Sequence, residues 1–126
     1  MKASETSLPE QKMALSTKRQ KELAKALTLL ISGAPFIDAE AIRERAAKRQ
    51  HKRLPASTSV WLAAVAHIRH VHTEYDALLN EGYDHESARH FVLEPINEVL
   101  TQWRATRFLE PEEAAEEALA DEDETG

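Results

Sequence analysis

The segment between Ser59 and Gly82 constrains the fold of this chain more than any other, because it contains neither glycine nor proline. Its apolar residues recur at helical spacing, and no window of the chain alternates with the period of two that is typical of a strand. A helix that starts after Thr58 or Ser59 and ends at Gly82 would span about 22 residues, or roughly 33 Å. This helix is therefore expected to be the spine of the domain. Its apolar face should comprise Trp61, Ala64, Val65, Ile68, Val71, Tyr75, Leu78 and Leu79.

Two shorter helices are expected before this spine. The first should cover residues 16–31, where leucines recur on one stripe among lysines and arginines. The second should cover residues 38–50, with the Asp38 carboxylate as its N-cap, because aspartate accepts hydrogen bonds from the free N–H groups of a first turn. Ile37 and Ile42 flank this cap at the spacing of a hydrophobic staple.

A glycine and a proline shape the chain after the spine. Gly82 should end the long helix in the left-handed conformation that C-terminal glycines favour. Asp84 should then cap a fourth helix, which returns antiparallel to the spine. Pro95 has no N–H group and should break that helix near Leu93, so that Pro95 starts a fresh segment. The expected fold is an all-α domain of about four helices, centred on a long antiparallel helical hairpin.

Charge is distributed unevenly along the chain. Of its 22 acidic residues, nine lie between residues 110 and 126, where no basic residue occurs. The other 13 acids and all 16 basic residues lie in residues 1–109. We therefore expect a flexible N-terminal segment at residues 1–15, a helical domain at residues 16–109 and a disordered or loosely helical acidic tail at residues 110–126.

Composition excludes several classes of protein. The chain has no cysteine, which excludes disulfides, thiolate nucleophiles and cysteine-containing metal sites. Residues 60–66 form the longest apolar run, which is far shorter than the ~20 residues that a membrane span needs, and the start of the chain lacks the apolar stretch of a secretory signal. We expect a soluble, cytoplasmic protein without membrane association. No Gly-rich phosphate loop or nucleophile elbow is present, which argues against an enzyme.

A polar strip is expected along the long helix, where Arg69, Thr73 and Asp76 project together beside His70. One interpretation is a structural network that sets the register of the hairpin. In it Asp76 would pair with Arg89, because the two residues lie equally far from the turn. The other is a small-anion-binding or enzymatic site, with Arg69 as the anion anchor, His70 as a proton-transfer group and Asp76 as its orienter.

A second polar group lies on the far side of the same helix. His67, His70 and Glu74 have the spacing H-x-x-H-x-x-x-E, and their side chains are of the types that bind zinc. No fourth ligand is evident, and the H-E-x-x-H order of many zinc enzymes is absent. Exposed histidines with an i,i+4 contact to Glu74 are therefore the favoured interpretation, and neither a metal nor another cofactor is expected.

The run from Val65 to Leu79 resembles the hallmark of an uncharacterised family, domain of unknown function 2293, which reads roughly A-x-I-R-H-x-x-T-x-Y-D-x-L-L. The resemblance extends over most of residues 25–104, whereas residues 51–59 depart from the family pattern. It implies no particular activity. The positions that the resemblance marks as candidate site residues are Arg69, His70, Thr73, Tyr75, Asp76 and Arg89.

A basic stripe is expected on the second helix, at the spacing i, i+3, i+4, i+7. It comprises Arg45, Lys48, Arg49 and Lys52, with Arg43 and Arg53 nearby. Such a stripe is most often a solvated face, but it is also typical of nucleic-acid contacts, and an acidic protein partner is a third alternative. The acidic tail would compete with phosphates for it. We therefore expect a helical binding module, and the alternatives are the anion or enzyme site and a structural protein that forms homodimers through Trp61 and Trp103.

Overall fold

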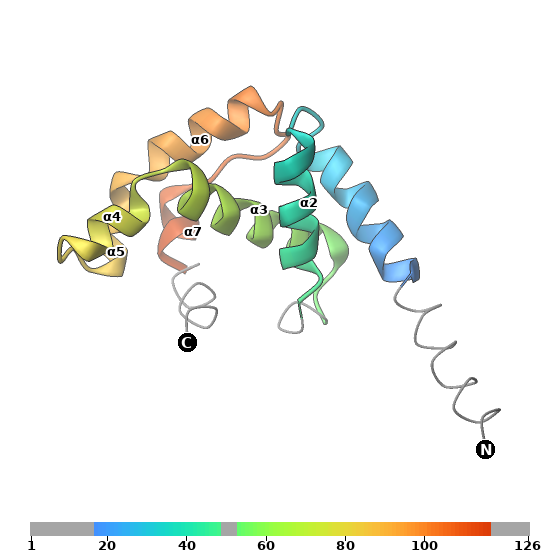
Figure 1. Cartoon of the computed structure of the whole chain (residues 1–126), viewed down its shortest axis with the longest axis horizontal. Helices are drawn as coiled ribbons and strands as arrows, with labels where there is room; N and C mark the ends of the chain where they lie inside the picture. Colours follow the sequence, from blue (N-terminus) through green and yellow to red (C-terminus); the bar gives the residue numbers. More distant parts are fainter. Residues whose placement is uncertain (1–16, 49–52, 117–126) are drawn as a thin grey trace, which may run out of the picture.

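The computed structural model describes residues 17–48 and 53–116, and these residues form helices joined by short connections (Figure 1). Within the two described ranges, the only strand-like contact is a single antiparallel bridge between Ile31 and Ala105. The all-α prediction is therefore confirmed. A first helix covers residues 17–30. It is followed by α2 (Phe36–Ala46), α3 (Ala56–His72), α4 (Tyr75–Asn80), α5 (His85–Phe91), α6 (Leu93–Gln102) and α7 (Pro111–Glu116).

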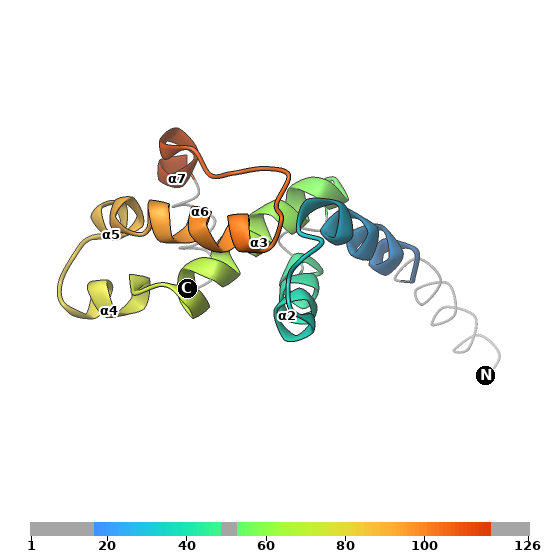
Figure 2. The ribbon, with the colours of Figure 1, turned by 90° about the horizontal axis from the view of Figure 1, so that it is seen from above.

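The core forms around α3, which carries a row of fully buried side chains. The first helix and α2 lie at one end of α3, whereas α4 and α5 lie at the other (Figure 1). Both views place α6 alongside α3 (Figures 1 and 2). Trp61 and Trp103 are buried in this core, together with Leu23 and Ile31 of the N-terminal region. The first helix is thus packed into the domain.

The predicted spine is wrong at its start and in its middle. α3 begins at Ala56 after Pro55, without a cap from Thr58 or Ser59, and the helix is broken at Thr73. This residue is extended, with φ −132° and ψ 175°, so that α3 has 17 residues and ends one residue earlier. The Thr73 hydroxyl donates to the carbonyl of Arg69, and the N–H of Tyr75 donates to the Thr73 hydroxyl at 3.2 Å. These local side-chain bonds compete with the backbone ladder of the helix. The long hairpin is therefore divided into shorter helices.

The prediction for the second helix is wrong at both ends. α2 begins at Phe36, after Pro35, so Asp38 lies inside the first turn and is buried rather than acting as the N-cap. Ile37 is 81% exposed, whereas Ile42 is fully buried, and the expected hydrophobic staple is absent from this part of the described chain. The helix ends at Ala46 instead of near residue 50. Residues 49–52 lie outside the described residues.

The turn after α4 confirms the expected helix ending at Gly82, which has a φ of +104°. The N–H of Tyr83 donates to the carbonyl of Leu78 and that of Gly82 to Leu79, which is the pattern of a Schellman motif. Asp84 caps α5 as predicted, because its carboxylate accepts from the N–H of Ser87 at 2.7 Å. The same bond holds the pKa of Asp84 below its ordinary value.

The predicted break near Leu93 is also confirmed, because α5 ends at Phe91 and α6 begins at Leu93. Pro95 is the third residue of α6 rather than its first. Proline fits there because the N–H groups of a first turn have no partner within the helix.

The chain after α6 returns across the domain. The N–H of Gly33 donates to the carbonyl of Trp103 at 2.8 Å, and a Cβ at Gly33 would lie 3.1 Å from that carbonyl group. Further along, the side chain of Asn97 exchanges two hydrogen bonds with the backbone of Leu109. α7 then packs against α5 and buries Ala114. The beginning of the expected acidic tail is thus helical and packed. No helix in the described ranges has the length and apolar character needed to cross a membrane.

Candidate functional site

The break at Thr73 brings together two buried arginines and a buried tyrosine. Arg69 of α3 and Arg89 of α5 are only 1% and 3% exposed, and Tyr75 at the start of α4 is completely buried. The Arg69 guanidinium carbon lies 5.6 Å from the centroid of the Tyr75 ring, and Arg89 donates from Nη1 to the Tyr75 hydroxyl at 3.2 Å. Three helices therefore contribute to one cluster that contains two cationic side chains.

The Tyr75 hydroxyl is the polar centre of this cluster. It lies 2.8 Å from Nδ1 of His85 as well as within hydrogen-bond distance of Arg89. A phenolic oxygen can donate one hydrogen bond and accept others, so it can satisfy both neighbours at once. His85 is not among the residues predicted for the site, because nothing in its spacing connects it to Tyr75.

A histidine–aspartate pair spans the break between α3 and α4. Nδ1 of His70 lies 2.8 Å from Oδ1 of Asp76, and the His70 ring meets the Tyr75 ring edge to face at 5.3 Å. Asp76 is thus paired with His70, and the predicted ion pair between Asp76 and Arg89 is absent from the described contacts. The reason is the break itself, which changes the direction of the chain before Asp76. An orienting role for Asp76 is compatible with this geometry, and proton transfer by His70 stays a prediction.

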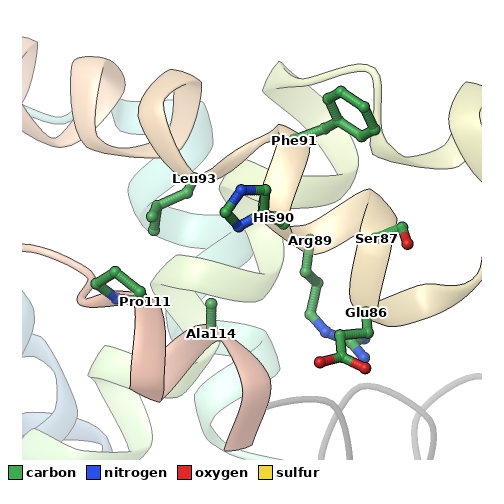
Figure 3. Close-up of a pocket in the computed structure, with 8 residues that line it drawn as sticks. All are labelled: Glu86, Ser87, Arg89, His90, Phe91, Leu93, Pro111 and Ala114. Carbon is green, nitrogen blue, oxygen red and sulfur yellow. The ribbon is translucent and has the colours of Figure 1, made fainter.

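A cavity of about 320 Å³ lies next to Arg89, between α5, the start of α6 and α7 (Figure 3). The Nε atom of Arg89 is buried and has no hydrogen-bond partner among the described residues. This cavity is not predictable from the sequence, in which the residues of α7 have the composition of an acidic tail. The cavity is lined by Glu86, Ser87, Arg89, His90, Phe91, Leu93, Pro111 and Ala114.

A separate cluster joins α2 to the C-terminal end of α3. Oδ1 of Asp38 lies 2.7 Å from Nε2 of His67 and 2.7 Å from Nε2 of His72. Burial raises the pKa of the Asp38 carboxyl, but hydrogen bonds and charge from the two histidines outweigh burial and hold that pKa below its ordinary value. Among the described residues, this is the one group of three histidine or acidic side chains whose ligand atoms all lie within 4.8 Å of one another.

The metal candidates from the sequence do not come together. His67 contacts Asp38 and His70 contacts Asp76, while Glu74 is exposed at the break. The observed group is not predictable from the sequence for two reasons. Asp38 lies 29 residues before His67. His67 and His72 are five residues apart, which places them about 140° apart around an ideal helix.

The basic stripe is only partly described, and the helix that should align it ends early. Lys48 lies beyond the end of α2 and is exposed, as is Arg53, while Arg45 is half-buried. Arg43 pairs with Glu40 at 2.7 Å and also contacts Gln20. Arg49 and Lys52 lie outside the described residues. Lys48 therefore does not share a helical face with Arg45, contrary to the prediction for the four basic residues.

Fold and site together define a small all-α domain built on a helix that breaks at a buried arginine–tyrosine cluster. The chain belongs to the family described as uncharacterized conserved protein (DUF2293), whose family model matches residues 26–104. This span includes Arg69, Tyr75 and Arg89 as well as Asp38, His67 and His72. No curated protein and no solved structure shows a significant match to the chain.

Proposed function

We propose that this domain binds a small ligand that carries a phosphate or carboxylate group, and that Arg89 is its anchor. One observation carries the proposal: Arg89 is 3% exposed, its Nε lacks a partner among the described residues, and it lines the cavity. A buried guanidinium loses hydration that costs several kcal/mol unless an anion or hydrogen bonds compensate for it. A phosphate or carboxylate group next to Arg89 would provide both.

The lining of the cavity supports a ligand with an apolar part. Phe91, Leu93, Pro111 and Ala114 provide apolar surface, and Ser87 and His90 provide polar groups. A volume of about 320 Å³ lies at the lower end of the range for small-molecule sites. Arg69 adds a second buried positive charge to the cluster at Tyr75. An aryl or alkyl phosphate, or the corresponding carboxylate, therefore suits the site.

Calorimetric titration of the full chain with phenyl phosphate tests this proposal, and benzoate in a parallel titration distinguishes phosphate from carboxylate ligands. We expect Arg89→Gln to weaken binding at least tenfold, which corresponds to about 1.4 kcal/mol. Arg89→Lys keeps the positive charge but loses the planar guanidinium group that can donate two parallel hydrogen bonds. Its affinity should therefore be intermediate between those of the wild type and Arg89→Gln. Arg53→Gln is the matched control, because Arg53 is exposed in the connection before α3 and does not line the cavity.

A second variant keeps the test informative if Arg89→Gln does not fold. Glu86 is exposed on the cavity wall, so Glu86→Gln should leave the fold intact and remove a negative charge that repels an anion. We expect this variant to bind more tightly, whereas Glu98→Gln, on the exposed side of α6, should not change the affinity. Unchanged affinity in a folded Arg89→Gln variant would disprove the proposal.

Nucleic-acid binding is a second candidate, and the exposure of Lys48 and Arg53 favours it. Both residues lie in the connection between α2 and α3, and the sequence of this connection also contains Arg49 and Lys52. In fluorescence anisotropy with labelled duplex DNA, each phosphate contact should add ~0.9 to the slope of log affinity against log salt. Charge reversal at Lys48 and Arg53 should lower that slope, whereas Lys18→Glu, at an exposed position of the first helix, should not.

The acidic tail can be tested in the same assay, provided that α7 is retained because Ala114 is buried. A chain truncated after Glu116 loses five acids, and we expect it to bind DNA more tightly than the full chain. Equal affinity of the two chains would exclude competition by this part of the tail. No salt-dependent binding by either chain would exclude the nucleic-acid candidate altogether.

A further inference from the structure

The cluster of Asp38, His67 and His72 has no role in the anion site, and it contains the ligand types of a metal centre. Two imidazole nitrogens and one carboxylate oxygen converge from α2 and α3, with both Nε2 atoms 2.7 Å from the same Oδ1. We propose that these three residues bind a divalent transition-metal ion of the zinc class. Two histidines and one carboxylate are a ligand set that zinc and non-haem iron sites both use.

Charge supports a cation at this place. The Asp38 side chain is only 12% exposed, and the ion pairs described for it are those with His67 and His72. With both imidazoles neutral, the cluster would carry one net negative charge, which sits between two imidazole nitrogens. A divalent ion compensates that charge and takes the place of the protons that the two Nε2 atoms would otherwise donate.

The position of the cluster in the fold also favours a cation. His72 is the last residue of α3, where the free carbonyl groups of a helix terminus create a negative potential. The His72 side chain is 34% exposed, whereas those of His67 and Asp38 are 9% and 12% exposed. An ion therefore has access from solvent on the side of His72. Three protein ligands leave the fourth position of a tetrahedral centre to water.

Trp103 provides a built-in reporter for metal binding. Its ring meets the ring of His72 edge to face, with centroids 5.5 Å apart. A paramagnetic ion bound at His72 should therefore quench the fluorescence of Trp103. The chain has two tryptophans, and a Trp61→Phe background isolates the signal of Trp103.

The experiment uses the full chain without an affinity tag, freed of metal by a chelator. We expect calorimetry to give one zinc ion per chain, cobalt to produce the visible absorption of a tetrahedral centre and to quench Trp103, and magnesium, which prefers oxygen ligands, to have no effect. His72→Gln and Asp38→Asn should each weaken zinc binding at least tenfold. His90→Gln is the matched control, because His90 is an exposed histidine on α5, and it should bind zinc as the wild type does.

Each result decides the proposal. Asp38→Asn retains an oxygen that can accept hydrogen bonds from the histidines, and circular dichroism of each variant verifies that it is folded. Loss of zinc binding in folded His72→Gln or Asp38→Asn, with binding kept in His90→Gln, supports the site. Absence of zinc binding by the wild type, or equal binding by all variants, overturns it. The anion titration with phenyl phosphate is unaffected by either outcome, since the two sites share no residue.

Discussion

Leu23→Ala is expected to lower the free energy of unfolding by about 2–5 kcal/mol. Leu23 lies on the first helix and is fully buried in the same core as Ile31 and Trp103. Removing its side chain loses apolar burial and leaves a cavity that the surrounding helices only partly fill. Equilibrium unfolding of the full chain in urea, for the wild type and the variant, measures the difference in the free energy of unfolding.

Leu29→Ala is the control for this prediction. It removes the same atoms from the same helix, but Leu29 is 67% exposed, so the expected change is within about 0.5 kcal/mol. Both variants change helix propensity equally, which leaves burial as the difference between them. A Leu23→Ala variant as stable as Leu29→Ala would show that the first helix does not contribute to the core in solution.

Tyr75→Ala is expected to cost about 3–5 kcal/mol, the range for deleting a buried aromatic side chain. Tyr75 is fully buried at the start of α4, with the Arg69 guanidinium over its ring and the His70 ring edge to face with it. Its loss removes packing and leaves the Nη1 group of Arg89 without its hydroxyl partner. Thermal and urea unfolding, followed by circular dichroism, should both report the destabilisation.

Tyr75→Phe separates packing from hydrogen bonding in the same cluster. It keeps the ring but removes the oxygen that contacts Arg89 and His85, so we expect a cost of about 1–3 kcal/mol. Tyr83→Phe removes a hydroxyl from a tyrosine that is 41% exposed and should be nearly neutral. Equal stability of Tyr75→Phe and the wild type would mean that the hydroxyl contacts contribute nothing to the fold.

Several elements could be predicted from the sequence because their causes are local. Gly82 ends α4 through its own backbone freedom, and Asp84 caps α5 through a bond to Ser87, three residues away. Pro95 breaks the helical run before α6 because it lacks an N–H group. The all-α class and the family assignment follow from patterns of the same kind, since periodicity and motif spacing are properties of neighbouring residues.

The candidate site could be predicted only in part. The helical projection gathered Arg69, His70, Thr73 and Asp76, and these residues do lie around the break between α3 and α4. Their partners differ from the prediction because the projection assumed a continuous helix. The cavity beside Arg89 was not predictable from local signals, because it requires α7 to pack against α5.

The sequence by itself determined the all-α class, the helix ending at Gly82, the cap at Asp84 and the break before α6. Tertiary structure decided the rest. It placed Asp38 inside α2 and against His67 and His72, although its local sequence suits an N-cap, because two long-range hydrogen bonds outweigh one local bond. It also buried Arg69 and Arg89 around Tyr75. Contacts between residues far apart in the chain arise from packing, which no local pattern encodes.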